Sequence, residues 1–177
     1  KVMRKVLLTL MVLLLGFGML YSAAQQEAQF PTKPLTIVCP WSPGGGTDRI
    51  ARFMAEQLTA VLGQPVNVVN KTGGSGAVGH AEAANAAPDG YTIGNLTFEV
   101  NTLKYLGYST ITPNDFIPLI QFNEDAAAVT VGANSPYKTV PELLNAVKSG
   151  AEGKFSFSGS GIGTVWDLAR IAMLDKY

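Results

Sequence analysis

Apolar and polar positions follow regular patterns after about residue 34. Residues 35–39 form a short apolar run of the kind found in buried strands, and three glycines follow at 44–46. Between about residue 48 and residue 62, apolar side chains recur at spacings of three and four, which predicts an amphipathic helix. Gly63 is placed to end that helix. The pattern predicts a strand, a glycine-rich turn and a helix in succession.

The start of this helix offers two side chains for capping. Thr47 and Asp48 both have oxygen atoms that can accept a hydrogen bond from a first-turn amide. An acid at this position also interacts favourably with the positive end of the helix dipole. For Asp48 we favour such a structural role, hydrogen bonding to turn amides, over a role as a general base.

The same rhythm continues through the next stretch of the chain. Residues 66–70 are rich in β-branched side chains and predict a second strand, an alanine-rich helix is expected over about 77–87, and a third strand over 91–96. Alternation of strands and helices is typical of a parallel α/β sheet. The sequence therefore predicts an α/β fold.

The pattern weakens after residue 100. Residues 101–114 have little periodicity, and short strands are predicted at 116–121, 127–131 and 154–158. Thr139 and Glu142 match a capping box, which predicts a helix that ends at Gly150. A final helix is expected after the last glycine-rich turn.

Glycine-rich turns occupy three strand-to-helix junctions, at 40–48, 71–79 and 158–164. Turns at the carboxyl ends of parallel strands can converge on one crevice. Unobstructed backbone N–H groups and a helix N-terminus favour an anion there. Because the first turn lacks the lysine of a phosphate-binding loop, we read it as suited to a carboxylate. The alternative is that the glycines only make a tight connection.

The first residues have the features of an export signal. A basic head precedes an apolar centre at 6–20, and small residues at 22–24 offer a cleavage site. We therefore predict a signal peptide at 1–24, with an uncleaved membrane anchor as the alternative, and a polar tether at 25–33. Removal of 1–24 leaves 10 basic and 13 acidic residues, a net charge of −3, which does not favour binding to nucleic acid.

Few residues of this chain are suited to catalysis. Cys39, the only cysteine, is expected to be a buried thiol, and a single His80 excludes a histidine-rich metal site. We expect His80 to be a surface side chain near the start of its helix. No serine lies in a Gly-x-Ser-x-Gly motif. The sequence indicates no metal or cofactor.

Dinucleotide binding is the main alternative to carboxylate binding. Residues 74–79 fit Gly-x-Gly-x-x-Gly, and Glu99 lies twenty residues further on, where a ribose-binding acid is expected. Against this reading, a complete strand and helix precede the motif, and export separates the chain from cytosolic nicotinamide cofactors. We expect the turn to be structural, with partial ligand contact.

Several motifs together resemble a known family of receptors. Residues 30–38, the Pro-Trp-Ser-Pro-Gly-Gly-Gly-Thr-Asp segment at 40–48, the glycines at 73–76, the Pro-Asp-Gly-Tyr-Thr segment at 88–92 and the turn at 159–163 occur in the same order as in the TctC or Bug family. These are the extracytoplasmic solute-binding receptors of tripartite tricarboxylate transporters. The resemblance covers essentially the whole chain after the predicted signal peptide.

This resemblance implies a type II periplasmic-binding-protein fold with two hinged α/β lobes, here truncated. We assign the first lobe to 34–110 and the start of the second to 111–177. A monomeric periplasmic receptor is expected, which binds a small carboxylate without catalysis and delivers it to membrane transporter subunits. The ligand-binding residues implied are Trp41, Ser42, Pro43, Gly44, Gly45, Gly46, Thr47, Asp48, Thr97, Phe98, Ser158, Gly159, Ser160, Gly161, Gly163 and Thr164.

Two departures from the family matter for function. Asp167 stands where many members have a histidine, and a carboxylate facing inward there would repel an anion. Family members also continue well beyond residue 177, so we expect exposed strand edges, exposed apolar surface and marginal stability. An exported nucleotide-dependent oxidoreductase and a truncated remnant that binds nothing are the alternative functions.

Overall fold

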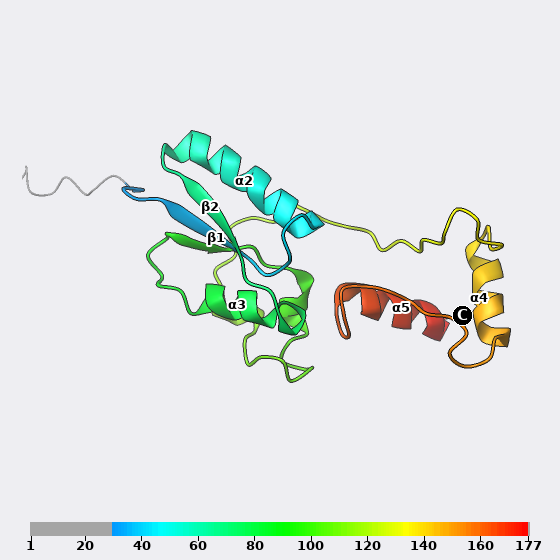
Figure 1. Ribbon diagram of the computed structural model, residues 1–177. Coiled ribbons are helices and arrows are strands. Elements are labelled where there is room, and N and C mark those ends of the chain that lie inside the picture. Colours follow the sequence, from blue (N-terminus) through cyan, green and yellow to red (C-terminus); the bar gives the residue numbers. More distant parts are fainter. Residues whose placement is uncertain (1–29, 177) are drawn as a thin grey trace, which may run out of the picture.

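The computed structural model of the protein describes residues 30–176 (Figure 1). The predicted signal peptide at 1–24 and most of the predicted tether lie outside the described residues. Within the described part, no helix combines the length and the apolar character needed to cross a membrane.

A small parallel sheet forms the centre of the N-terminal region, with strand order β2-β1-β3. The strands are β1 (Leu35–Cys39), β2 (Val66–Asn70) and β3 (Thr92–Gly94), which confirms the three strands predicted there. The central strand β1 pairs in parallel with both neighbours, so that Ile37 lies between Val68 and Ile93.

Helices cover the two faces of this sheet. In Figure 1, α2 (Gly46–Leu62) lies on one side of the strands and α3 (Ala77–Ala84) on the other. The core lies between α2 and the sheet, where burial of each large apolar side chain contributes roughly 1.5–3 kcal/mol. Its buried members are Leu35, Ile37, Cys39, Ala51, Ala55 and Val66. The buried thiol expected for Cys39 is confirmed.

The ends of α2 follow one prediction and correct another. Gly63 adopts a left-handed conformation (φ 67°), and its N–H donates to the Thr59 carbonyl, so the predicted end is confirmed. At the start, the capping position is Gly45, and neither Thr47 nor Asp48 caps the helix. Asp48 lies inside the first turn, and its carboxylate accepts a hydrogen bond from the N–H of Gly44 instead.

The helix α3 is shorter than predicted and fits closely beneath the sheet. It follows a short 3-10 turn, η1 (Gly74–Gly76), and ends at Ala84 rather than near residue 87. A Cβ atom on Gly79 would lie 2.5 Å from the Pro40 Cα atom and 2.7 Å from the Lys71 carbonyl oxygen. Glycine at position 79 therefore permits the close approach of α3 to the end of β1.

Beyond β3 the chain contains two short 3-10 turns and two helices. These are η2 (Phe98–Asn101), η3 (Pro113–Asp115), α4 (Val140–Ser149) and α5 (Val165–Lys176). The predicted capping box is confirmed, because Thr139 Oγ1 accepts from the Glu142 N–H and the Glu142 carboxylate accepts from the Thr139 N–H. In Figure 1, an extended segment leads to α4, and α5 begins beside the sheet-containing region.

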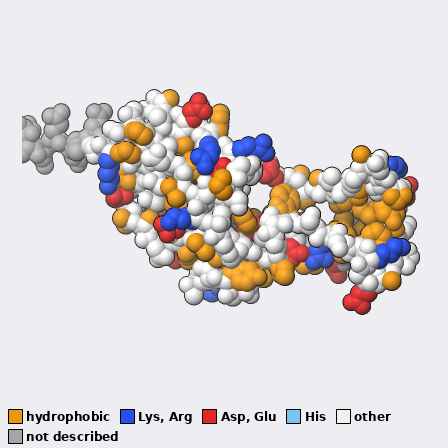
Figure 2. Space-filling model, in the orientation of Figure 1, with side chains coloured by type: hydrophobic (Ala, Val, Ile, Leu, Met, Phe, Trp, Pro, Cys, Tyr) orange, Lys and Arg blue, Asp and Glu red, His pale blue; other side chains and the backbone are white. Residues whose placement is uncertain are grey.

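The strands predicted at 116–121, 127–131 and 154–158 are wrong, because the structure forms none there. An isolated strand is not stable, and no neighbouring strand pairs with these segments within residues 30–176. Apolar side chains in this part remain exposed, as Ile117 (88%) and Leu119 (76%) show. Figure 2 shows hydrophobic side chains gathered on the surface at the α4 end of the molecule. The expected exposed apolar surface is therefore present.

Candidate functional site

The first glycine-rich turn links β1 to α2 and is held from inside by an acid. Gly44 has a positive φ of 83°, and its N–H donates to Asp48 Oδ2 over 2.8 Å. Gly45 is extended, and its N–H donates to the Ser42 carbonyl over 3.3 Å. These bonds fix the turn so that the chain enters α2 directly after Gly45.

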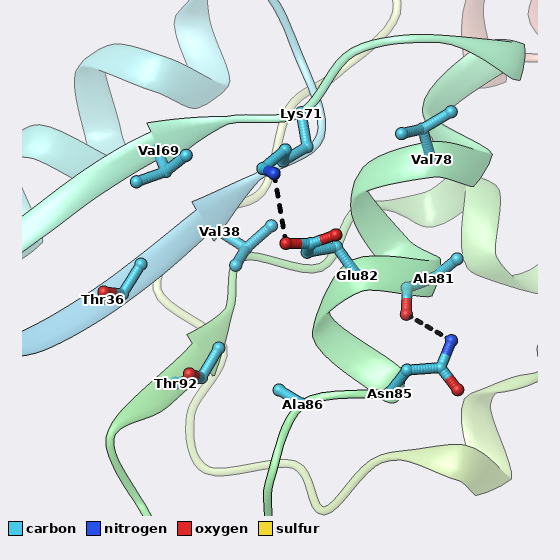
Figure 3. Close-up of a pocket in the computed structure, with 10 residues that line it drawn as sticks. All are labelled: Thr36, Val38, Val69, Lys71, Val78, Ala81, Glu82, Asn85, Ala86 and Thr92. Atoms are coloured by element: carbon cyan, nitrogen blue, oxygen red, sulfur yellow. Dashed lines mark hydrogen bonds and ion pairs between the residues drawn. The ribbon is translucent and has the colours of Figure 1, made fainter.

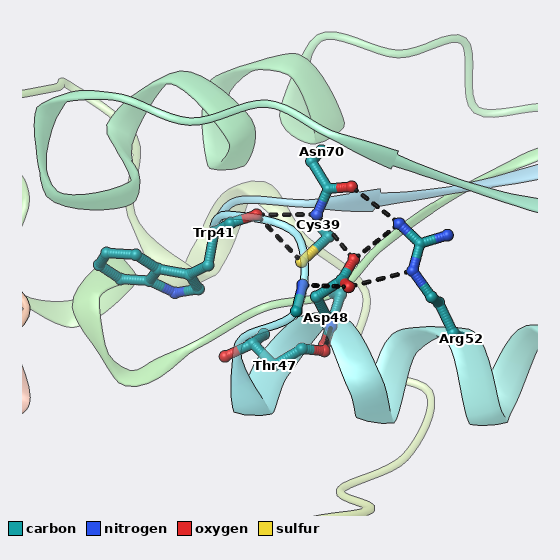
Figure 4. Close-up of polar contacts among 8 residues, drawn as sticks. Cys39, Trp41, Thr47, Asp48, Arg52 and Asn70 are labelled. Atoms are coloured by element: carbon teal, nitrogen blue, oxygen red, sulfur yellow. Dashed lines mark hydrogen bonds and ion pairs between the residues drawn. The ribbon is translucent and has the colours of Figure 1, made fainter.

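The Asp48 carboxylate is buried and fully engaged (Figure 4). Arg52 Nε donates to Oδ2 over 3.0 Å, and Asn70 Nδ2 donates to Oδ1 over 2.8 Å. Hydrogen bonds from Arg52, Gly44 and Asn70 lower the pKa of Asp48 to about 2. Asp48 therefore stays ionised and holds the turn, the end of β2 and α2 together.

The first turn of α2 keeps backbone donors free. The N–H groups of Gly46, Thr47 and Asp48 donate to no protein acceptor within residues 30–176, as expected for the first turn of a helix. The helix dipole adds a partial positive charge at this point. This end of the helix is therefore suited to accept an anion.

Next to this helix start, a chain of polar contacts surrounds Thr97. Trp41 Nε1 donates to Thr97 Oγ1 over 3.2 Å, and Thr97 Oγ1 donates to Glu99 Oε2 over 2.6 Å. The Thr97 N–H donates to His80 Nε2 over 3.1 Å, so the proton of the neutral imidazole lies on Nδ1, which donates to the Gly76 carbonyl over 2.7 Å. The network joins the ends of β1 and β3 to α3.

The surface position expected for His80 is wrong, because its side chain is 1% exposed. It faces the end of β3, and both ring nitrogens have backbone partners. Burial lowers the pKa of His80, which favours the neutral ring that these two bonds require. His80 therefore has a structural role in holding the Thr97 loop, the segment 95–97 that follows β3.

The turn before α5 repeats the construction of the first turn. Gly163 also has a positive φ, 76°, and its N–H donates to Asp167 Oδ2 over 2.9 Å. Arg170 pairs with the same carboxylate over 2.8 Å, and the bonds from Gly163 and Arg170 lower the pKa of Asp167. The Asp167 charge is therefore compensated by Gly163 and Arg170, as the Asp48 charge is by Gly44 and Arg52.

One cavity, with a volume of about 800 Å³, is lined by residues of all three glycine-rich turns and by Thr97. No lysine or arginine is among the described residues that line it. Predicted site residues that line the cavity are Trp41, Ser42, Gly45, Gly46, Thr47, Thr97, Phe98 and Ser160. Those outside its lining are Pro43, Gly44, Asp48, Ser158, Gly159, Gly161, Gly163 and Thr164.

Other lining residues were not among the predicted site residues. Gly73, Ser75 and Gly76 belong to the second glycine-rich turn, for which partial ligand contact was the only expectation. The rest are Ile50, Thr72, Asn95, Leu96, Glu99, Ile120, Gln121, Phe122, Asn123, Asp125, Val165 and Trp166. Residues 120–125 carry no motif, so only the path of the chain could place them here.

A second hollow lies on the sheet face next to α3 (Figure 3). Val38 and Val69 line it, and the Lys71–Glu82 ion pair, 3.1 Å long, spans it at one side. None of the predicted site residues lines this hollow.

Comparison with known proteins places the chain in a family. The sequence profile of the TctC family, described as the tripartite tricarboxylate transporter family receptor, matches residues 50–176. A crystal structure of a TctC solute-binding protein from Polaromonas, solved without ligand, matches with a TM-score of 0.60 and 40% sequence identity, over 83% of this chain and 50% of that chain.

Curated relatives agree with this assignment. The UPF0065 protein in the tcbD-tcbE intergenic region of Pseudomonas sp. (strain P51) is 33% identical, over 82% of this chain and 44% of the relative. The UPF0065 protein in the gbd 5′ region of Cupriavidus necator is 32% identical, over 87% of this chain and 47% of the relative. The chain spans about half the length of the curated relatives it matches. The fold is that of a periplasmic binding protein, and the chain belongs to the TctC family of receptors.

Proposed function

We propose that the whole protein is a periplasmic receptor that captures a small organic acid and delivers it to a tripartite tricarboxylate-type membrane transporter. Membership of the receptor family supports this role, and the family is one of solute-binding receptors rather than enzymes. In this proposal the predicted signal peptide at 1–24 exports the chain. The two lobes are 34–110 and the part that begins at 111, and the receptor acts as a monomer.

The start of α2 carries the proposal. Gly46 and Thr47, whose N–H groups have no acceptor within residues 30–176, line the shared cavity at the positive end of a 17-residue helix. A helix dipole stabilises a nearby anion by about 0.3–1 kcal/mol, and by up to about 2 kcal/mol in a partly buried site. Charge-assisted hydrogen bonds from the same N–H groups strengthen the interaction. These donors match a carboxylate without any basic side chain.

Side-chain hydroxyls add further donors around the same cavity. Ser42, Thr47 and Ser160 line it, whereas the Thr97 hydroxyl already donates to Glu99 Oε2. We assign direct ligand contact to these lining residues. Asp48 and Gly44 instead hold the geometry of the turn, and for the other predicted residues of 158–164 contact remains a prediction.

Substitution at Gly46 tests the proposal. A Cβ atom there would meet no atom within 4 Å, so Gly46→Val is expected to fold while its side chain covers the N–H groups of the turn. Calorimetric titration with short carboxylic acids, and with their neutral amides as controls, should show binding of one or more acids and loss of at least about tenfold in affinity in Gly46→Val.

Gly132→Val is the matched control, because position 132 is equally open and lies outside the cavity. Its affinity should equal that of the unchanged protein. Equal affinity in Gly46→Val would remove this turn from the site. A saturable response to NAD in place of the acids would support the oxidoreductase alternative.

The structure bears on that alternative through Glu99. The carboxylate that would bind a ribose is 3% exposed and accepts hydrogen bonds from Thr97 Oγ1 and the Val165 N–H. A nucleotide would have to displace both partners. The receptor function is therefore the better supported of the two.

A further inference from the structure

Three hydrogen bonds join the N-terminal region to the turn before α5 and to the first residue of α5. Ser75 Oγ donates to the Ile162 carbonyl over 3.4 Å, and Thr102 Oγ1 donates to the Gly163 carbonyl over 3.4 Å. The third runs from the N–H of Val165, the first residue of α5, to Glu99 Oε1 over 3.1 Å. The third bond differs from the other two, because its acceptor is a carboxylate and its donor lies at the start of a helix.

The position of Glu99 is fixed from both sides. Its Oε2 atom accepts from Thr97 Oγ1 over 2.6 Å, and the side chain is almost completely buried at the wall of the shared cavity. Gly163, in the turn that Glu99 contacts, also packs against Leu106, leaving no room for a Cβ atom. The Glu99 carboxylate is therefore held in a fixed position in the contact between the N-terminal region and the start of α5.

The two helix starts at the cavity are consequently unequal. Within residues 30–176, the N–H groups of the first three α2 residues have no acceptor. At α5 the N–H of Val165 bonds a carboxylate of the chain, and only the N–H groups of Trp166 and Asp167 have none. Both helices begin after a glycine of positive φ whose N–H is held by an acid four residues later. The α5 start thus has the construction of an anion site, and the Glu99 carboxylate occupies its first donor.

We propose that Glu99 determines ligand specificity, by filling the anion position at α5 so that the cavity accepts only one ligand carboxylate, at α2. This inference rests on the proposed receptor function. The far end of the ligand then meets the Glu99 and Asp125 side chains and no lysine or arginine. A second carboxylate there is repelled, whereas a neutral or cationic group is accepted. The substrate class is a monocarboxylate, including acids with an ammonium group at the other end.

Exchange of Glu99 for glutamine separates charge from shape. In Glu99→Gln, the side-chain oxygen can still accept from the Val165 N–H, and the side-chain amide can donate to Thr97 Oγ1. The negative charge is removed while the contact between the regions is kept. The matched control is Glu56→Gln, an exposed position on α2 outside the cavity.

The specificity is measured as the relative affinity for three acids with four-carbon chains. Butyrate, 4-aminobutyrate and succinate are titrated by calorimetry against the whole chain and both variants. In the unchanged protein, the better of the two monocarboxylates should bind at least about tenfold tighter than succinate. In Glu99→Gln this ratio should fall by at least about tenfold, and in Glu56→Gln it should be unchanged.

The possible outcomes distinguish the two proposals. An unchanged ratio in Glu99→Gln, or tighter binding of succinate by the unchanged protein, overturns the inference and leaves the receptor function standing. Failure of butyrate and 4-aminobutyrate to bind while another acid binds at Gly46 and Thr47 also overturns the inference, and failure of every carboxylic acid tested contradicts the receptor function.

A measurement without ligand tests the contact itself. In Glu99→Ala the Val165 amide loses its acceptor, so its hydrogen exchange should become at least about tenfold faster than in the unchanged protein, while exchange in β1 is retained. The same Val165 exchange rate in both proteins would show that Glu99 does not occupy the α5 start.

Discussion

Asn70 Nδ2 donates a hydrogen bond to Asp48 Oδ1 over 2.8 Å and so ties the end of β2 to the first turn of α2. The same Asn70 amide also donates to the Trp41 carbonyl over 2.8 Å, at the start of the glycine-rich turn. One side chain thus connects the strand, the turn and the helix that frame the proposed anion site. Asp48 and Asn70 are therefore central to the geometry of the site without lining the cavity.

Replacement of Asp48 by asparagine should destabilise the protein by about 2 kcal/mol, because a buried charged acceptor of several hydrogen bonds is lost. The pKa of Asp48 in the folded protein, about 2, lies below the ordinary value of 3.8. Its stabilising contribution is therefore complete above about pH 4 and is lost as the pH falls towards 2. Urea unfolding at several pH values checks both effects.

In Asp48→Asn the loss of stability between about pH 4 and pH 2 should be smaller than in the unchanged protein. Other acids, such as Asp167, also have lowered pKa values and keep their share of the slope. Identical slopes in the two proteins would mean that the Asp48 carboxylate is not held as described.

His80 should make stability depend on pH near neutrality. Burial lowers its pKa below 6.5, so its contribution is complete above about pH 6.5 and is lost as the pH falls below that value. His80 is the only histidine in the chain, so His80→Gln should remove the dependence between about pH 5 and pH 7. Thermal melting across this range measures the effect, and a slope that persists in His80→Gln would contradict it.

Gly79→Ala should destabilise the protein by about 1–3 kcal/mol, because the added methyl group would overlap backbone atoms of Pro40 and Lys71. Gly132→Ala is the control, since no atom lies within 4 Å of its Cβ position, and its stability should change by less than about 0.5 kcal/mol. Denaturant midpoints compare the two variants. Equal midpoints would show that α3 does not pack closely against the end of β1.

Hydrogen exchange should divide the chain into protected and unprotected segments. Strand β1 has a hydrogen-bonded neighbour on each side, whereas no backbone hydrogen bond of a sheet involves residues 117–131 within the described part. Exchange measured by mass spectrometry should be slow in 35–39 and fast in 117–131. For the 25–177 segment we expect marginal stability, and native-like protection in both halves with a cooperative melt would contradict that expectation.

Local pattern predicted the N-terminal region well. The strand at 35–39, the amphipathic helix that ends at Gly63 and the capping box at Thr139 all depend on side chains within a few residues of one another. Such features follow from propensity and periodicity alone. The strands at 116–121 and 127–131 failed because a strand also needs a partner, which no local pattern supplies.

The site shows the same division. Most residues predicted in the first glycine-rich turn line the cavity, because their motif lies within a single turn, whereas of those predicted in 158–164 only Ser160 does. Glu99 was considered only as a ribose-binding acid, because its contact with Val165 spans 66 residues and depends on how the two regions meet. His80 was misplaced for the same reason, since its partner Thr97 lies on another element.

The most direct test of the central claim is residue-resolved NMR of the amide groups during titration with a carboxylate that binds. If peptide N–H groups at the start of α2 hold the acid, the amide signals of Gly46 and Thr47 should move in a saturable way, with the same affinity that calorimetry gives. Saturable shifts confined to other parts of the chain, with the Gly46 and Thr47 signals unmoved, would contradict the account.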